Sequence, residues 1–209
     1  NYRYLTDERE LRARLTELGI GAVTILDEIA GKSWSGAELK ELCTDLDRLV
    51  DVVQGMAPVW ARVPAREIVE RWNGSTLPTH WSRTTGPDGR ARFYDSLEEL
   101  SNDLELLRKT LHREPRVYSG PEGGIASAAD ADVVVAHLAR VEESARVLRA
   151  LEERGLVFRG GGNFLLKGGK EDVRARSLLD LPQLVQKSGQ ADVDVQRYKG
   201  LGEMNADQL

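Results

Sequence analysis

The chain has 209 residues, of which 41% are hydrophobic and 30% are charged, so it can bury a substantial core in one or two globular modules. This composition argues against a disordered chain. The formal net charge of −5 and the pI of about 5.4 argue against an independent DNA-binding domain, because such domains carry an excess of Lys and Arg on a basic face.

The N-terminal part of the chain predicts a helix between two β segments. Residues 2–5 have the pattern of a strand end, and Thr6 is placed to cap a helix whose first turn is acidic. Gly19 is expected to end this helix. Residues 22–26 then form a short β-rich run, so the chain leaves the helix as a strand.

A second helix is predicted after residue 35. Ser35 and Glu38 form a capping box, and apolar residues follow at three- and four-residue steps, which indicates a helix of about five turns. The residues of this apolar seam are Leu39, Leu42, Leu46, Leu49 and Val53. Pro64 is expected to open a further short helix that faces inward through Ile68, Val69 and Trp72.

The middle of the chain predicts a loop or hairpin over residues 73–90, with a turn at 87–89, followed by a third helix. Ser96 and Glu99 form a second capping box before that helix. Its apolar seam consists of Leu97, Leu100, Leu104, Leu107 and Leu111. Within residues 113–129 a strand is expected around Val117 and Tyr118, followed by a surface loop.

A long helix is predicted over residues 131–154 and ended by Gly155, with an inward face of Val134, Leu138, Val141, Ala145, Leu148 and Leu151. Three long amphipathic helices predict a helical bundle with small β additions, that is, an α+β fold. The seams could instead form a surface for another protein. An internal core is favoured, because each apolar stripe needs a partner and the other two are at hand.

The region after Gly155 predicts small β elements. Residues 157–158 and 164–166 flank a glycine-rich turn, which is interpreted as a hairpin because no helix start or P-loop lysine-serine pair follows it. Residues 177–188 form a short helix with an early Pro182. The residues after it, 192–195, alternate between polar and apolar, as a half-buried strand does.

Cysteine and histidine usage limits the chemistry. The single cysteine excludes an internal disulfide, agrees with a reducing compartment and lies on an apolar stripe, so Cys43 is expected to be a buried, inert thiol. His80, His112 and His137 are widely spaced, and no structural metal is expected. The absence of a signal peptide or an apolar run of membrane-spanning length predicts a cytoplasmic protein.

The most informative segment is a loop of two cations and two glycines that precedes a predicted helix start. Arg197 and Lys199 supply charge, whereas Gly200 and Gly202 let backbone N–H groups approach an anion closely. Asn205 caps the helix. These features suit a phosphate, although a plain connection is the commoner use of such spacing. Two nearby carboxylates, on residues 192 and 194, lie on one face of the preceding strand, and no metal is assigned to them.

The same segment carries a family resemblance. The contiguous string resembles the Q-R-Y-K-G-L-G-E-M-N signature that closes the TOPRIM domain in the B subunit of bacterial type IIA DNA topoisomerases. It comprises Gln196, Arg197, Tyr198, Lys199, Gly200, Leu201, Gly202, Glu203, Met204 and Asn205.

The resemblance extends beyond the signature. Residues 2–8 look like the segment that leaves the TOPRIM sheet, and residues 177–189 look like the helix that returns to it. The residues between resemble the long insertion of many Gram-negative gyrase-type B subunits, and residues 35–72 and 132–155 look like its helices, more faintly than the signature does. The resemblance thus implies three parts: the end of a first TOPRIM segment (1–26), an insertion domain (27–176) and a return to TOPRIM (177–209).

This resemblance implies a role in ATP-dependent DNA supercoiling or relaxation by double-strand passage. The signature's Arg197, Lys199, Gly200 and Gly202 would contact DNA, and its remaining residues would support them. In the implied A2B2 heterotetramer, the partners are DNA, the A subunit, and the remainder of the B subunit. The family's Mg²⁺ carboxylates, ATP site and nucleophilic tyrosine lie elsewhere, so this chain is expected to be an internal, inactive piece without catalytic, cofactor or metal residues. The alternative is a helical protein-interaction module with no direct DNA role.

Overall fold

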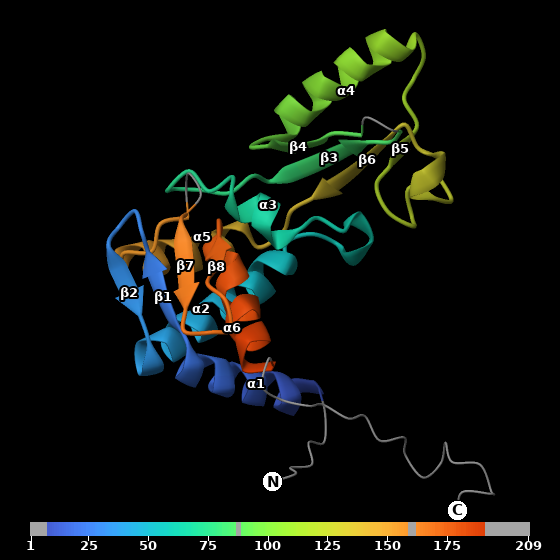
Figure 1. The fold of residues 1–209 in the computed structure, drawn as a ribbon. Helices are drawn as coiled ribbons and strands as arrows, with labels where there is room; N and C mark the ends of the chain where they lie inside the picture. Colours follow the sequence, from blue (N-terminus) through green and yellow to red (C-terminus); the bar gives the residue numbers. More distant parts are fainter. Residues whose placement is uncertain (1–7, 87–88, 159–161, 191–209) are drawn as a thin grey trace, which may run out of the picture.

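The computed structural model describes residues 8–86, 89–158 and 162–190. These residues form an α+β fold, which confirms the predicted fold class. The fold contains two four-stranded sheets. Figure 1 shows the two sheets one above the other, with helices on the outside of each and helix α3 (Ala65–Val69) between them.

The first sheet gathers strands from both ends of the chain. Its order is β2-β1-β7-β8, and every pairing is antiparallel. The strands are β1 (Thr24–Asp27), β2 (Lys32–Trp34), β7 (Phe164–Lys167) and β8 (Val173–Ala175). The helices on this side are α1 (Glu8–Ala22), α2 (Gly36–Gln54), α5 (Val141–Glu153) and α6 (Leu181–Gln190) (Figure 1).

The second sheet is formed by the middle of the chain, in the order β4-β3-β6-β5. Its strands are β3 (His80–Thr84), β4 (Ala91–Tyr94), β5 (Val117–Tyr118) and β6 (Val133–His137). The β5–β6 pairing is parallel and the others are antiparallel. Helix α4 (Leu97–Leu111) lies over this sheet, at the end of the molecule opposite α1 (Figure 1). Three short 3₁₀ helices complete the described elements: η1 (Val59–Ala61), η2 (Ala128–Asp130) and η3 (Leu178–Asp180).

One hydrophobic cluster runs through both sheets. It includes Ile25 of the first sheet, Trp81 of the second and Leu148 of α5, none of them more than 1% exposed. The predicted seam of α2 is buried along its whole length. The predicted seam of α4 is buried only at Leu100, while Leu97 is 63% exposed. The expectation of an internal core is therefore confirmed for α2 and only partly for α4.

The helix starts differ in how they are capped. Ser96 accepts a hydrogen bond from Glu99 N at 3.2 Å, as the predicted capping box requires. The Glu99 carboxylate accepts its hydrogen bond from Asp95 N at 2.8 Å, one residue before the Ser96 N–H that a capping box uses. Ser35 occupies the N-cap position of α2 but makes no side-chain cap hydrogen bond. The box predicted at Ser35 is thus wrong in its contact, although the helix begins where expected.

The predicted helix over residues 131–154 is wrong in its first half, which forms β6 instead. The run of β-branched valines at 133–135 favours a strand. Val134 and Leu138 fit the spacing of a helical face as well, which explains the error. Arg140, in the left-handed conformation with φ of 55°, separates β6 from α5. The predicted three-helix bundle is therefore replaced by two sheets with helices around them.

The predicted hairpin between residues 157–158 and 164–166 is also wrong. Phe164 pairs with Asp27 of β1 on one side and with Ala175 of β8 on the other. Strand β7 is thus central in its sheet and has no free edge for residues 157–158. The β1 partner lies far away in the sequence, where local patterns carry no information about pairing.

Helices α1 and α6 cross in backbone contact at two glycines. A Cβ atom on Gly189 would lie 2.0 Å from the carbonyl oxygen of Leu15, and one on Gly19 would lie 1.9 Å from that of Val185. The prediction that Gly19 ends α1 is wrong, because the helix continues to Ala22. The lack of a side chain at Gly19 serves this close crossing instead.

Candidate functional site

The predicted DNA-contact loop lies outside the described residues. All residues of the signature, Gln196 to Asn205, fall in the segment 191–209, as do Asp192 and Asp194. The structure does place the helices that lead to both ends of the chain. Helix α6 ends at Gln190 and packs against α1, with Gly189 next to Leu15 in the middle of that helix (Figure 1).

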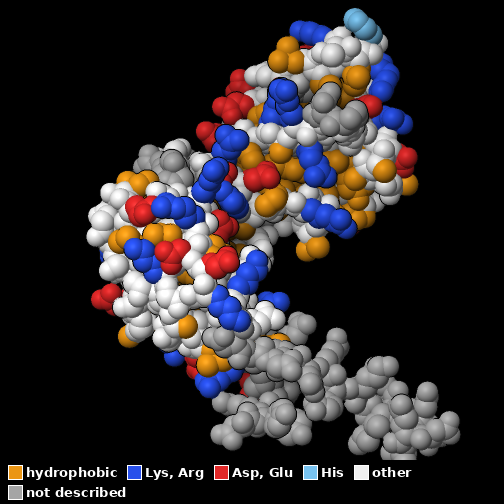
Figure 2. Space-filling model, viewed as in Figure 1, with side chains coloured by type: hydrophobic (Ala, Val, Ile, Leu, Met, Phe, Trp, Pro, Cys, Tyr) orange, Lys and Arg blue, Asp and Glu red, His pale blue; other side chains and the backbone are white. Residues whose placement is uncertain are grey.

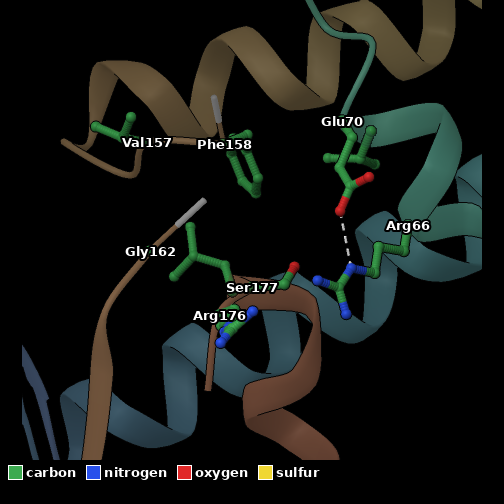
Figure 3. A pocket seen from close by; sticks show the side chains of 9 residues that line it. Arg66, Glu70, Val157, Phe158, Gly162, Arg176 and Ser177 are labelled. Carbon is green, nitrogen blue, oxygen red and sulfur yellow. Dashed lines mark hydrogen bonds and ion pairs between the residues drawn. The ribbon is translucent and has the colours of Figure 1, made fainter. Parts of the chain in front are cut away.

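A small pocket lies between α3, residues 157–158 and the start of η3 (Figure 3). Its volume of about 100 Å³ is well below the roughly 300–1,000 Å³ of small-molecule sites. The pocket therefore has room for water or a small ion, and it cannot enclose a nucleotide.

The polar side chains of this pocket are mostly paired. Arg66 donates to Glu70 at 2.8 Å, as Figure 3 shows, and lies 3.6 Å from Asp180. These two carboxylates, Glu70 first, raise the pKa of the Arg66 guanidinium above its usual value. The Ser177 hydroxyl accepts a hydrogen bond from Leu179 N. With its main cation balanced by two acids, this pocket is a weak candidate for anion binding.

A shallow basic depression lies at the C-terminal end of α4, lined by Arg108, Lys109, His112, Arg113 and Glu114. Its arginines are also engaged. Arg108 pairs with Glu105 and Glu114, and Arg113 binds both carboxylate oxygens of Asp132 at 2.7 and 2.8 Å. Because carboxylates already neutralise Arg108 and Arg113, the depression attracts an external phosphate only weakly.

On the face that Figure 2 shows, basic and acidic side chains are interspersed. Figure 2 shows Lys and Arg side chains across the middle of one face with Asp and Glu beside them. Arg71 and Arg83 lie over the rings of Phe93 and Trp81, at 5.3 and 5.7 Å from the ring centroids. This interspersed pattern agrees with the acidic net charge and leaves any DNA contact local.

Cys43 is 1% exposed in α2, which confirms the predicted buried thiol. Burial, and to a lesser extent the charge of Asp47, raises the pKa of this thiol to about 12. The reactive thiolate form is therefore negligible at neutral pH.

The histidines are arranged differently from what their spacing suggests. His80 of β3 and His137 of β6 lie directly opposite each other, with ring centroids 5.1 Å apart. Burial, and then the neighbouring His137, lowers the pKa of His80. Sequence spacing could not reveal this pair, since only the β3–β6 pairing brings the two residues together. Over the described ranges, no group of three or more His, Cys, Asp and Glu is arranged to hold a metal ion.

No helix within the described part of the chain is long and apolar enough to cross a membrane.

Comparison with known proteins gives a relation over nearly the whole chain. No protein-family model matches it. It is 29% identical over 210 residues to the B subunit of DNA gyrase from Caulobacter vibrioides, in both strain NA1000 / CB15N and strain ATCC 19089 / CIP 103742 / CB 15. The match covers 99% of this chain and 24% of each relative, so the chain spans about a quarter of their length. This similarity supports a relation to the B subunit of DNA gyrase.

Proposed function

We propose that the chain is part of the B subunit of a DNA gyrase, an ATP-dependent type IIA DNA topoisomerase. The observation that carries the proposal is the similarity to two gyrase B proteins along 99% of the chain, together with the terminal signature in the same sequence. A chance match to a short motif would not extend over the predicted insertion as well. The proposed setting is cytoplasmic.

In this proposal, residues 1–26 and 177–209 belong to a TOPRIM domain and residues 27–176 form its insertion. The close crossing of α1 and α6 supports the arrangement, because an inserted segment must leave and re-enter its parent domain at neighbouring points. Strand β1 pairs with both β2 and β7, so the first sheet contains strands from both sides of the first boundary.

The proposed DNA contacts are Arg197 and Lys199, with Gly200 and Gly202 allowing close approach to the backbone. Mg²⁺ and ATP would be bound by other parts of the longer protein. In an A2B2 assembly, the proposed partners are DNA, the A subunit, and the remainder of the B subunit. The role of this chain would be to help hold DNA next to the cleavage centre.

The test compares the complete gyrase with its Lys199→Ala variant in DNA binding at several salt concentrations. A phosphate contact is independent of sequence, so the variant should bind all DNA sequences more weakly by a similar factor and reduce the salt slope by about one unit. Lys187→Ala provides a matched control, because Lys187 is an exposed lysine on α6 outside the signature. Parallel salt slopes, with thermal stability lost instead, would contradict the DNA-contact proposal.

A second candidate function is a protein-interaction module, and the surface of α4 favours it. Leu104, Leu107 and Leu111 are only partly buried, and Leu106 is 60% exposed. A helix with an incompletely covered apolar seam can dock a partner. Unchanged DNA binding in the Lys199→Ala gyrase would favour this second function.

A further inference from the structure

Two of the three histidines in the chain face each other across neighbouring strands. His80 of β3 is the direct partner of His137 of β6 in an antiparallel pairing. Leu138 N donates to Thr79 O at 2.8 Å, and at the other end of the ladder Thr85 N donates to Asp132 O at 3.0 Å, which places the hydrogen-bonded positions of the β3–β6 pairing at odd-numbered residues of β3. The next pair, His80 and His137, is then the non-hydrogen-bonded type, in which side chains on the same face approach most closely.

The hydrogen bonds around His80 favour one tautomer of its ring. The Thr79 hydroxyl oxygen lies 2.9 Å from His80 Nδ1 and 2.9 Å from the backbone carbonyl oxygen of Asp95. A carbonyl oxygen can only accept, so when the single hydroxyl proton goes to Asp95, Thr79 accepts from Nδ1–H and both contacts are satisfied. His80 therefore presents the lone pair of Nε2 away from this contact, in the manner of metal-ligating histidines.

The separation of the two rings suits a shared ion. Their centroids lie 5.1 Å apart with an interplanar angle of 71°. Two imidazoles bonded to one ion at about 2.0–2.1 Å, in tetrahedral geometry, have ring centroids roughly 5 Å apart. The backbone pairing thus already holds the rings at the distance that such an ion would require.

We propose that His80 and His137 form a two-histidine site for a divalent transition-metal ion of the Zn²⁺, Ni²⁺ or Cu²⁺ class. Imidazole suits these ions, whereas Mg²⁺ and Ca²⁺ prefer oxygen ligands. His80 is half-buried and His137 is exposed, so water can complete the coordination. With two protein ligands, the site is open and exchangeable, and an ion bound there links the β3–β4 hairpin to β6. This inference does not depend on the proposed gyrase function.

The test is calorimetric titration of the 209-residue chain with Zn²⁺ and with Ni²⁺ in buffer free of chelators. One ion should bind per chain, and binding should raise the melting temperature, because the ion favours the folded state. His80→Ala and His137→Ala should each abolish binding. His112→Asn is the control and should bind as the wild type does, since Asn tolerates the left-handed backbone of residue 112.

Thr79→Val examines the tautomer without removing a ligand. The variant keeps the shape of the side chain but loses the acceptor for Nδ1–H, and metal affinity should fall about 10-fold. If a histidine variant fails to fold, ¹H–¹⁵N spectra of the wild-type histidines decide the matter, because Zn²⁺ should shift Nε2 of His80. Binding that survives both histidine variants, or no binding by the wild type, would overturn the proposal and leave the pair as a packing contact.

Discussion

At the scale of single residues, Asp132 is the best-connected carboxylate in the described part of the chain. Arg113 binds both of its oxygens, and Arg116 N donates to it at 2.7 Å. These contacts, that of Arg113 first, hold the pKa of Asp132 well below its usual range. The aspartate thus fastens the segment that leads into β5 to the start of β6, where the only parallel pairing of the described strands forms.

Asp132→Asn should lower the free energy of unfolding by about 1–2 kcal/mol at neutral pH, since it removes charge-assisted hydrogen bonds to a partly exposed arginine. A carboxylate with a depressed folded pKa stabilises the protein above its unfolded pKa, near 4, and this stabilisation is lost as pH falls through the folded pKa. The difference between wild type and variant should therefore shrink in acid. Urea unfolding at several pH values measures it.

Asp130→Asn is the matched control, because Asp130 is exposed and lies in the neighbouring η2. Its unfolding free energy should stay within about 0.5 kcal/mol of the wild type. If the cost of Asp132→Asn were the same at all pH values, packing of the side chain and not its charge would be responsible.

At the scale of elements, α2 shows when the spacing of apolar residues is enough to predict a helix and its buried face. All five residues of its predicted seam are buried, because a long helix that packs on the core through one face needs an apolar stripe at that spacing. Strand β6 shows where prediction from apolar spacing fails. Its residues fit a helical face as well as a strand, and its true identity depends on pairing with β3 and β5, which lie elsewhere in the sequence.

The same limit applies to the candidate sites. The signature at 196–205 can be identified from the sequence alone, because its residues are contiguous. The His80–His137 pair cannot be identified this way, because it arises only from the register of two strands. Likewise, the role of Gly19 depends on α6, and its sequence neighbours alone indicate no more than a helix end.

The crossing of α1 and α6 gives a prediction at this scale. Gly189→Ala should destabilise the protein by about 1–3 kcal/mol, since its Cβ would lie within 2.0 Å of the Leu15 carbonyl oxygen and the helices would have to separate. Gly21→Ala lies in the same helix pair with no atom within 4 Å of the added carbon, so it should be neutral or stabilise by up to about 1 kcal/mol. Thermal unfolding of both variants measures the contrast, and equal effects would mean that the helices do not cross this closely.

At the scale of the whole molecule, the two sheets share one hydrophobic cluster, while the helices that lead to both chain ends meet at one side. Under the proposed function, this meeting of the two helices would be the junction between the insertion and its parent domain. The chain carries a net charge of −5, and arginines such as Arg108 and Arg113 are paired with carboxylates. Under the proposed function, most DNA affinity would therefore come from the terminal signature and from the rest of the gyrase.

The isolated 209-residue chain should neither cleave nor supercoil DNA and should not hydrolyse ATP. The reason is that the proposed function places the Mg²⁺ carboxylates, the nucleophilic tyrosine and the ATP site in other parts of the assembly. Incubation with supercoiled plasmid and Mg²⁺, followed by electrophoresis, should leave the plasmid intact, and phosphate release from ATP should equal the protein-free rate. Metal-dependent nicking that disappears on changing Asp192 and Asp194 to Asn would contradict this expectation, because those two carboxylates would then hold a catalytic metal that the proposed function assigns elsewhere.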